Sequence, residues 1–198
     1  MANVVNEIKV RGCKITITYD EYAEDPRTFS EHLGKMHLEV NRHLHLIEIT
    51  DEETFNDVNL LRYKEADINP NLIAFPVYAY IHSGIALRLT EFYDKWDSGC
   101  AGYIVFDKKE VRDEFQLNND EELREKCFEL AKLEVEEYNQ YINGEVYEIT
   151  VRNTKTRKET SLGNFYGDIH KSDIMDLLAE VGISTEIQDT LPETLPMC

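Results

Sequence analysis

The segment 120–143 constrains the fold of this chain more than any other part of its sequence. Its apolar side chains recur at spacings of three and four residues, which places them on one stripe of an α-helix. These side chains are Leu123, Cys127, Leu130, Ala131, Val135, Tyr138 and Ile142. Asp120 is the predicted cap, and Gly144 ends the helix. Such a helix has to bury its stripe against a second layer, which the rest of the chain offers as β-strands.

Alternating or continuous apolar residues predict strands on both sides of this helix. The predicted strands cover 7–19 with a break at Gly12, 37–49, 72–89 with a break at Gly84, 102–106, 145–152 and 159–166. Further helices are predicted from Thr50 to about Lys64, from Asp107 to Phe115, and from Asp168 or Ser172 to Gly182. This order predicts an α+β fold, in which a mixed, mainly antiparallel sheet carries about three helices.

The length of 198 residues suits one domain, so residues 1–190 are predicted to form a single α+β domain. Residues 191–198 contain two prolines and are predicted to form a mobile C-terminal tail.

The cysteines and histidines predict no cofactor and no metal site. The four cysteines lie far apart in the sequence, at positions 13, 100, 127 and 198, which indicates free thiols in a reducing cytosol. Among the six histidines, only His43 and His45 have a spacing reminiscent of metal ligands. The chain has no signal-like start and no apolar run near the ~20 residues that span a bilayer. We therefore expect a cytoplasmic protein.

The charge of the chain is its outlying property. Its 39 acidic and 21 basic residues give a formal net charge of -18, far beyond the about 2–8 suited to a small domain. Such a charge repels nucleic acid and anionic membranes but attracts basic surfaces. The predicted partner is therefore a basic, nucleic-acid-binding protein rather than nucleic acid or a membrane. Solubility alone is the other explanation of this charge, and the composition leaves it open.

Acidic residues on predicted helices are the candidate partner-binding site. They are Glu122, Glu125, Glu129 and Glu136 on the helix 120–143, with Glu52 and Glu53 near the start of the helix predicted from Thr50. A rise of 1.5 Å per residue sets such carboxylates about 5–6 Å apart, which is similar to the phosphate spacing along a nucleic-acid strand. The other interpretation is a solvated helix face, partly compensated by Lys126 and Lys132.

Two glycine-containing segments, 80–84 and 93–102, concentrate reactive side chains. His82, Asp97 and Ser98 could supply a base, an orienting acid and a nucleophile, and they are the alternative catalytic candidates. The chain has no G-x-S-x-G elbow, P-loop or H-E-x-x-H motif. In the other interpretation, His82 is a hydrogen-bonded strand histidine and Trp96–Ser98 is a tight turn, with Trp96 packed on the core. We favour this second interpretation, and with it a non-enzymatic protein.

Residues 72–167 carry an ordered set of short motifs. The set is Tyr80-x-His82-Ser83-Gly84-Ile85, then Trp96-Asp97-Ser98-Gly99-x-x-Gly102-Tyr103-Ile104, then Glu137-Tyr138-Asn139-Gln140-Tyr141-x-x-Gly144-Glu145-Val146-Tyr147, then Gly163-Asn164-Phe165-Tyr166-Gly167. In this order it resembles a family of small proteins carried by phages, plasmids and integrative elements. The resemblance implies a genetic setting rather than an activity, and it assigns no functional residue.

Setting and charge together predict a function by analogy. Small acidic proteins of mobile elements often act against host defence, and some of them mimic DNA. We therefore expect a protein that binds and inhibits a host nucleic-acid-handling defence protein, of the anti-restriction or anti-CRISPR type. The alternative is a small enzyme or ligand-binding protein with its site around His82 and Trp96–Ser98. A phage structural or assembly protein is a third possibility.

Overall fold

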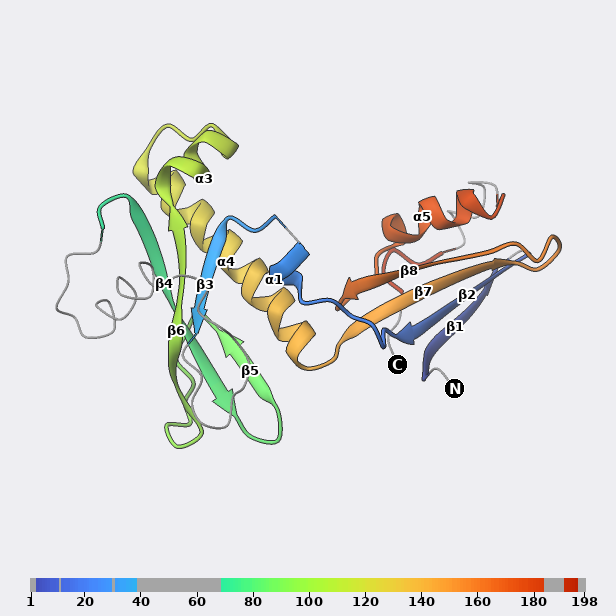
Figure 1. The fold of residues 1–198 in the computed structure, drawn as a ribbon, viewed down its shortest axis with the longest axis horizontal. Helices are drawn as coiled ribbons and strands as arrows, with labels where there is room; N and C mark the ends of the chain where they lie inside the picture. Colours follow the sequence, from blue (N-terminus) through green and yellow to red (C-terminus); the bar gives the residue numbers. More distant parts are fainter. Residues whose placement is uncertain (1–2, 11, 30, 39–68, 184–190, 196–198) are drawn as a thin grey trace. The chain divides into compact units, whose positions relative to one another are not determined.

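The computed structural model describes residues 3–10, 12–29, 31–38, 69–183 and 191–195 (Figure 1). The chain divides into two compact units, the first formed by Met1–Thr28 with Gly144–Cys198 and the second by Phe29–Asn143. The second unit is thus inserted into the first, and each unit has its own hydrophobic core. The single domain predicted for residues 1–190 thus contains two compact units. Apolar periodicity shows which residues are buried, but it does not show which core they enter.

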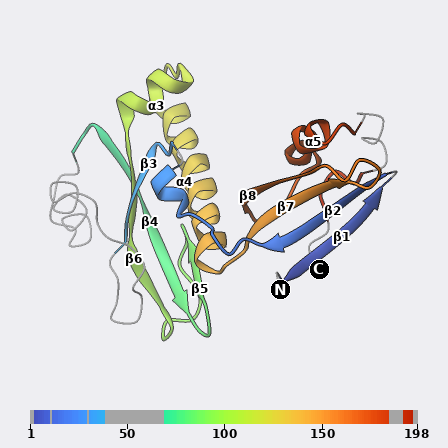
Figure 2. The ribbon, with the colours of Figure 1, turned by 45° about the vertical axis from the view of Figure 1, so that its right-hand side comes forward.

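The first unit is a four-stranded antiparallel sheet in the order β1-β2-β7-β8. Its strands are β1 (Val4–Val10), β2 (Cys13–Tyr19), β7 (Val146–Asn153) and β8 (Glu159–Tyr166). Helix α5 (Lys171–Glu180) lies over one face of this sheet (Figures 1 and 2). Alternate residues of β2 and β7, among them Ile15 and Ile149, are fully buried against Ile174 and Leu178 of this helix. Burial of this apolar area is the main force that holds the helix on the sheet.

Residues 191–195 are packed into the core of the first unit. Leu191 and Leu195 are buried, and the N–H of Leu195 donates to the carbonyl of Ile169 at 2.8 Å. Thr194 forms an isolated bridge with His170. This part of the predicted mobile tail is therefore an ordered extension of the core. Two prolines in such a short segment are typical of a mobile tail, but two leucines four residues apart can still be buried without forming a helix.

The second unit is a four-stranded antiparallel sheet in the order β3-β6-β4-β5. Its strands are β3 (Gly34–Leu38), β4 (Leu72–Ile81), β5 (Ile85–Arg88) and β6 (Ser98–Asp107), and its helices are α3 (Lys108–Phe115) and α4 (Asp120–Ile142). The short helix α1 (Pro26–Phe29) stands at the boundary between the units in the sequence. Two antiparallel sheets with helices confirm the predicted α+β class, although the strands form two sheets rather than one.

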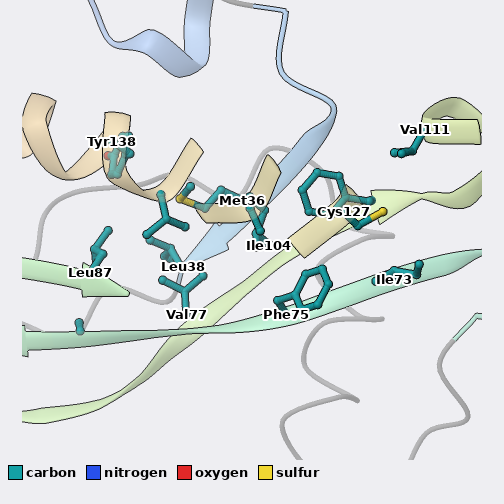
Figure 3. Close-up of a cluster of buried hydrophobic side chains, with 14 of the residues drawn as sticks. Met36, Leu38, Ile73, Phe75, Val77, Leu87, Ile104, Val111, Cys127 and Tyr138 are labelled. Atoms are coloured by element: carbon teal, nitrogen blue, oxygen red, sulfur yellow. The ribbon is translucent and has the colours of Figure 1, made fainter. Parts of the chain in front are cut away.

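Helix α4 buries its predicted stripe against the sheet of the second unit. Leu123, Cys127, Ala131, Val135 and Tyr138 are all at most 3% exposed. They pack with inward-facing residues of the strands, including Met36, Phe75 and Val77 (Figure 3). The cap is Asn119 rather than the predicted Asp120, since Asn119 Oδ1 accepts from the N–H of Glu122 at 2.8 Å. The strand break at Gly84 is confirmed, because β4 and β5 pair on either side of it.

Strand β6 starts earlier than predicted. It begins at Ser98 instead of 102, and its register with β4 shifts between Val77 and Tyr78. Glycines at 99 and 102 weakened the strand signal in the sequence, although glycine is tolerated at such an irregularity. Only 37–38 of the predicted strand 37–49 can be compared with the structure, where they end β3. The rest of that strand and the helix predicted from Thr50 lie outside the described residues.

Candidate functional site

Four glutamates line the outward face of α4, and we call them the carboxylate row: Glu122, Glu125, Glu129 and Glu136. All four are exposed, while the buried residues of α4 occupy the opposite side. At 3.6 residues per turn, the four positions fall within about 60° of one another around the helix axis. The row extends over 14 residues, or about 21 Å along the helix. The structure therefore brings these four predicted site residues onto one surface, whereas Glu52 and Glu53 lie outside the described residues.

The carboxylate row has little basic compensation within the described part of the chain. Glu129 pairs with Lys126 at 3.4 Å on the exposed surface, and the described residues offer no side-chain partner to the other three glutamates. Lys132 lies over the ring of Phe128, with its Nζ 4.4 Å from the ring centroid. An exposed pair such as Lys126–Glu129 is worth at most about 1 kcal/mol. Most of the negative charge of the row is thus available to a partner.

Two further glutamates of α4 have a different role. Glu134 is buried and accepts a hydrogen bond from the N–H of Gly34 at 3.0 Å. Glu137 lies 2.6 Å from Nε2 of His32. These contacts attach the start of β3 to α4. A side chain at Gly34 would collide with them, because a Cβ there would lie 2.7 Å from Glu134 Oε2. Composition alone does not distinguish these two structural glutamates from the carboxylate row. Their positions around the helix axis do, because they lie nearer the buried stripe of α4.

The negative charge is concentrated in the unit that carries α4. Residues 29–143 contain 24 of the 39 acidic residues and 12 of the 21 basic ones. They therefore carry -12 of the formal net charge of -18. A charge of this size raises the local concentration of a basic partner and repels anions.

His82 and Asp97 meet at the loops beside β4 and β6. His82 Nδ1 lies 2.9 Å from Asp97 Oδ2, and the backbone N–H of Ile81 donates to the Asp97 carbonyl at 2.8 Å. The ring of Tyr80 stacks on the His82 ring with a centroid distance of 6.1 Å. The His82 side chain is 67% exposed. The contact that the alternative catalytic interpretation requires is therefore present, at the surface of the second unit.

The serines near this pair are directed elsewhere. The hydroxyl of Ser98 donates to the carbonyl of Asp94, and that of Ser83 donates to the carbonyl of His82 at 2.6 Å. No nucleophile therefore contacts the imidazole within this set of candidates. Trp96 is 96% exposed rather than packed on the core. The backbone N–H of Trp96 donates to Asp94 Oδ1 at 2.8 Å in an Asx turn. The backbone therefore forms the tight turn of the second interpretation, but the indole ring is not packed on the core.

Other candidate sites are sparse in the described residues. A surface pocket of about 360 Å³ lies at the start of α5, lined by His170, Lys171, Ser172, Met175 and Glu193. None of the predicted site residues lines it. The described ranges contain no group of three or more histidine, cysteine or acidic side chains arranged to hold a metal ion. They also contain no helix with the length and apolarity required to cross a membrane.

Comparison with known proteins gives no family assignment. No protein-family model, no curated protein and no solved structure matches this chain. The resemblance to proteins of mobile elements therefore stays a prediction, and the functional argument depends on the geometry of the carboxylate row and of the His82–Asp97 pair.

Proposed function

We propose that this chain is a phage or mobile-element protein that binds and inhibits a nucleic-acid-handling defence protein in the cytosol of its host. The observation that carries the proposal is the carboxylate row, in which only Glu129 has a basic partner among the described residues. A basic groove that normally holds nucleic acid would attract this row and be occupied by it. The activity would then be inhibition by occlusion, of the anti-restriction or anti-CRISPR type.

The spacing of the carboxylate row supports DNA mimicry in its first half. The helical rise separates Glu122 from Glu125 by about 4.5 Å along the axis, and Glu125 from Glu129 by about 6 Å. Both steps are of the same order as the axial spacing of successive phosphates along one strand, about 3.4 Å, although they are longer. The next step, to Glu136, is about 10.5 Å, and it leaves room for Leu133, which is 68% exposed. This leucine offers the partner an apolar contact that a real phosphate backbone would lack.

The same charge argues against nucleic acid as the direct ligand. A unit with a net charge of -12 repels phosphates over a distance of about 10 Å at 0.1 M salt. We therefore expect binding to the basic protein in the absence of DNA, and competition between this chain and DNA for the same groove. Rising salt should weaken the complex, because exposed charges are screened.

A charge reversal with a matched control tests the proposal. The test variant replaces Glu122, Glu125, Glu129 and Glu136 with lysine. The control variant reverses four exposed acidic residues of the first unit, namely Glu21, Glu145, Asp168 and Asp176, and it changes the net charge by the same amount. Each tagged protein is used to capture partners from a host lysate, with elution by a salt gradient and identification by mass spectrometry. Circular dichroism verifies that both variants are folded.

The wild type and the control are expected to retain one nucleic-acid-handling protein that elutes at moderate salt and is displaced by duplex DNA. The row variant should lose it by at least tenfold. Equal loss from both variants would mean that net charge alone drives capture. Retention by the row variant would show that the row is not the binding surface, and either result would overturn the proposal.

A second candidate function is a small enzyme or ligand-binding protein that uses the His82–Asp97 pair. The 2.9 Å contact favours it, since a carboxylate that orients an imidazole is a common arrangement in acid–base sites. The test is a thermal-shift screen of metabolites with the wild type, with His82→Ala, and with Lys95→Ala as a control from the same loop. A ligand whose stabilising shift disappears only in His82→Ala would support a site. The absence of any such ligand would leave the pair as a surface contact.

A further inference from the structure

Strand β1 is an edge strand in the described part of the first unit. It pairs antiparallel with β2 from Val4 to Val10, with a register shift between Val4 and Asn6, and no strand in the described part of the chain pairs with its other edge. Edge strands present unpaired backbone N–H and C=O groups to any strand that approaches. The available edge is seven residues long and contains neither proline nor glycine. These properties make β1 a template for the addition of another strand.

The backbone groups that face outward can be identified from the hairpin. Val10 and Cys13 are paired across two intervening residues, which makes them a hydrogen-bonded pair of a two-residue hairpin. Hydrogen bonds to β2 then recur at every second residue, so Ile8 also bonds β2. The N–H and C=O groups of Glu7 and Lys9 point to the free edge. The N–H of Glu7 accordingly donates to the Asn6 side chain at 2.7 Å and not to β2.

Charge selects one register for a symmetric partner. In a two-fold antiparallel pairing that uses the outward groups of Glu7 and Lys9, outward groups must face outward groups, so the symmetry axis passes through Glu7, Ile8 or Lys9. An axis through Glu7 or Lys9 sets two like charges directly opposite each other, which is destabilising. An axis through Ile8 sets Glu7 of each copy opposite Lys9 of the other. Of these three registers, only the one centred on Ile8 pairs opposite charges.

We propose that β1 is a homodimer interface, in which it pairs antiparallel with β1 of a second copy about an axis at Ile8. The two sheets then join into one antiparallel sheet of eight strands. Glu7 already lies 3.0 Å from Lys9 and 2.5 Å from Lys14 of its own chain, and in the dimer it also meets Lys9 of the other copy. Ile8, half-buried beside the core of the first unit, contacts its symmetry mate. The proposal does not depend on the carboxylate row.

Mass measurement with charge-swap variants tests this interface. Light scattering of the full chain at about 100 µM, a concentration suited to a small interface, should give about 46 kDa, twice the mass of 23.1 kDa for one chain. Lys9→Glu and Glu7→Lys each place like charges opposite each other. Each variant should therefore raise the dissociation constant of the dimer at least tenfold and favour the monomer. The double variant Glu7→Lys with Lys9→Glu restores the opposite-charge pairs and should restore the dimer.

A cysteine scan tests the register. In a background with Cys100 and Cys198 replaced by serine, Ile8→Cys should form an intermolecular disulfide on mild oxidation, because directly opposed Cα atoms lie about 4.5–5.5 Å apart. Val4→Cys is the control. It is more exposed, but in this register the two copies of residue 4 lie about 26 Å apart. A monomer at all concentrations, a dimer unaffected by the single charge variants, or equal cross-linking of both cysteines would overturn the proposal.

Discussion

At the scale of single residues, Gly102 is the position where backbone sterics leave the least freedom. It lies in β6 opposite Leu38 of β3, at the point where the register with β4 shifts. A Cβ built on Gly102 would lie 2.0 Å from the backbone carbonyl oxygen of His37. Backbone atoms in a paired strand cannot move away as a flexible side chain can, so only glycine allows β3 and β6 to approach this closely.

We therefore expect Gly102→Ala to destabilise the protein by about 3 kcal/mol, at the upper end of the cost of overpacking. The free energy of unfolding in urea, followed by circular dichroism, measures the effect. Gly99→Ala is the control on the same strand, since a Cβ at Gly99 meets no atom within 4 Å. Similar losses for both variants would show that strand flexibility, and not the contact with His37, sets the cost.

At the scale of elements, two amide side chains, one in α4 and one just after its end, bind the outer edge of β5 in the second unit. Asn139 Oδ1 accepts from the N–H of Leu87 at 2.7 Å, and Asn139 Nδ2 donates to the carbonyl of the same residue at 2.7 Å. Asn143 Nδ2 donates similarly to the carbonyl of Ile85 at 2.8 Å. The amides occupy backbone groups of β5 that a neighbouring strand would otherwise bond, and they protect this edge from unwanted pairing.

Replacing Asn139 with leucine should cost about 1–3 kcal/mol of stability, because it leaves the N–H and the carbonyl of Leu87 without their partner. Hydrogen exchange is the sharper measurement, since the Leu87 amide should exchange much faster in the variant. Gln140→Leu, one residue further along α4, is the control and should change stability by less than about 0.5 kcal/mol. Unchanged protection of Leu87 in Asn139→Leu would contradict the role of the amide.

The elements show which features the sequence can predict. Periodicity located α4, the break at Gly84 and the hairpin of β7 and β8, because each depends on local apolar spacing. It did not locate the start of β6 at Ser98, where glycines interrupt the pattern. The division into two units also stayed hidden, because β2 pairs with β7, a strand more than 120 residues later in the sequence. Such pairings depend on tertiary contacts that no local window contains.

The candidate site was predictable to a similar degree. Helical spacing predicts that the carboxylate row lies on one face of α4, and the concentration of reactive side chains in two loops singled out His82 and Asp97, which lie in contact. The exposure of Trp96 was missed, since an indole is usually buried and only the Asx turn at Asp94 explains the loop. The stacking of Lys132 on Phe128 was missed as well, because a lysine four residues after an aromatic residue has no distinctive signal.

At the scale of the whole molecule, the proposed dimer interface and most of the negative charge belong to different units. Two thirds of the net negative charge lies in residues 29–143, while the proposed interface lies in β1 of the first unit. A dimer would carry two carboxylate rows, each on the unit that does not contain the β1 interface. Binding to a partner with two basic grooves would then gain from the linkage of the two sites.

The buried thiols make the stability of the protein sensitive to alkaline pH. Burial raises the pKa of Cys127 from 9.0 to about 11, and burial also raises the pKa of Cys13, Tyr78 and Tyr147. Between pH 9 and 11 the unfolded chain loses the Cys127 proton while the folded chain keeps it. The folded state then binds more protons than the unfolded state, so stability falls as pH rises through this window and is constant below it as far as this thiol is concerned.

We expect Cys127 alone to remove about 2 kcal/mol of stability between pH 8.5 and pH 11. Urea unfolding at several pH values measures the total loss, to which repulsion among the carboxylates also contributes as the lysines lose their charge. Cys127→Ala separates the two causes. The variant is less stable at pH 8.5, since a buried side chain is shortened, but its stability should fall less steeply above pH 9 because no thiol titrates at this position. If the stability of the variant fell with pH as steeply as that of the wild type, the alkaline loss would come from surface charge and not from the buried thiol of Cys127.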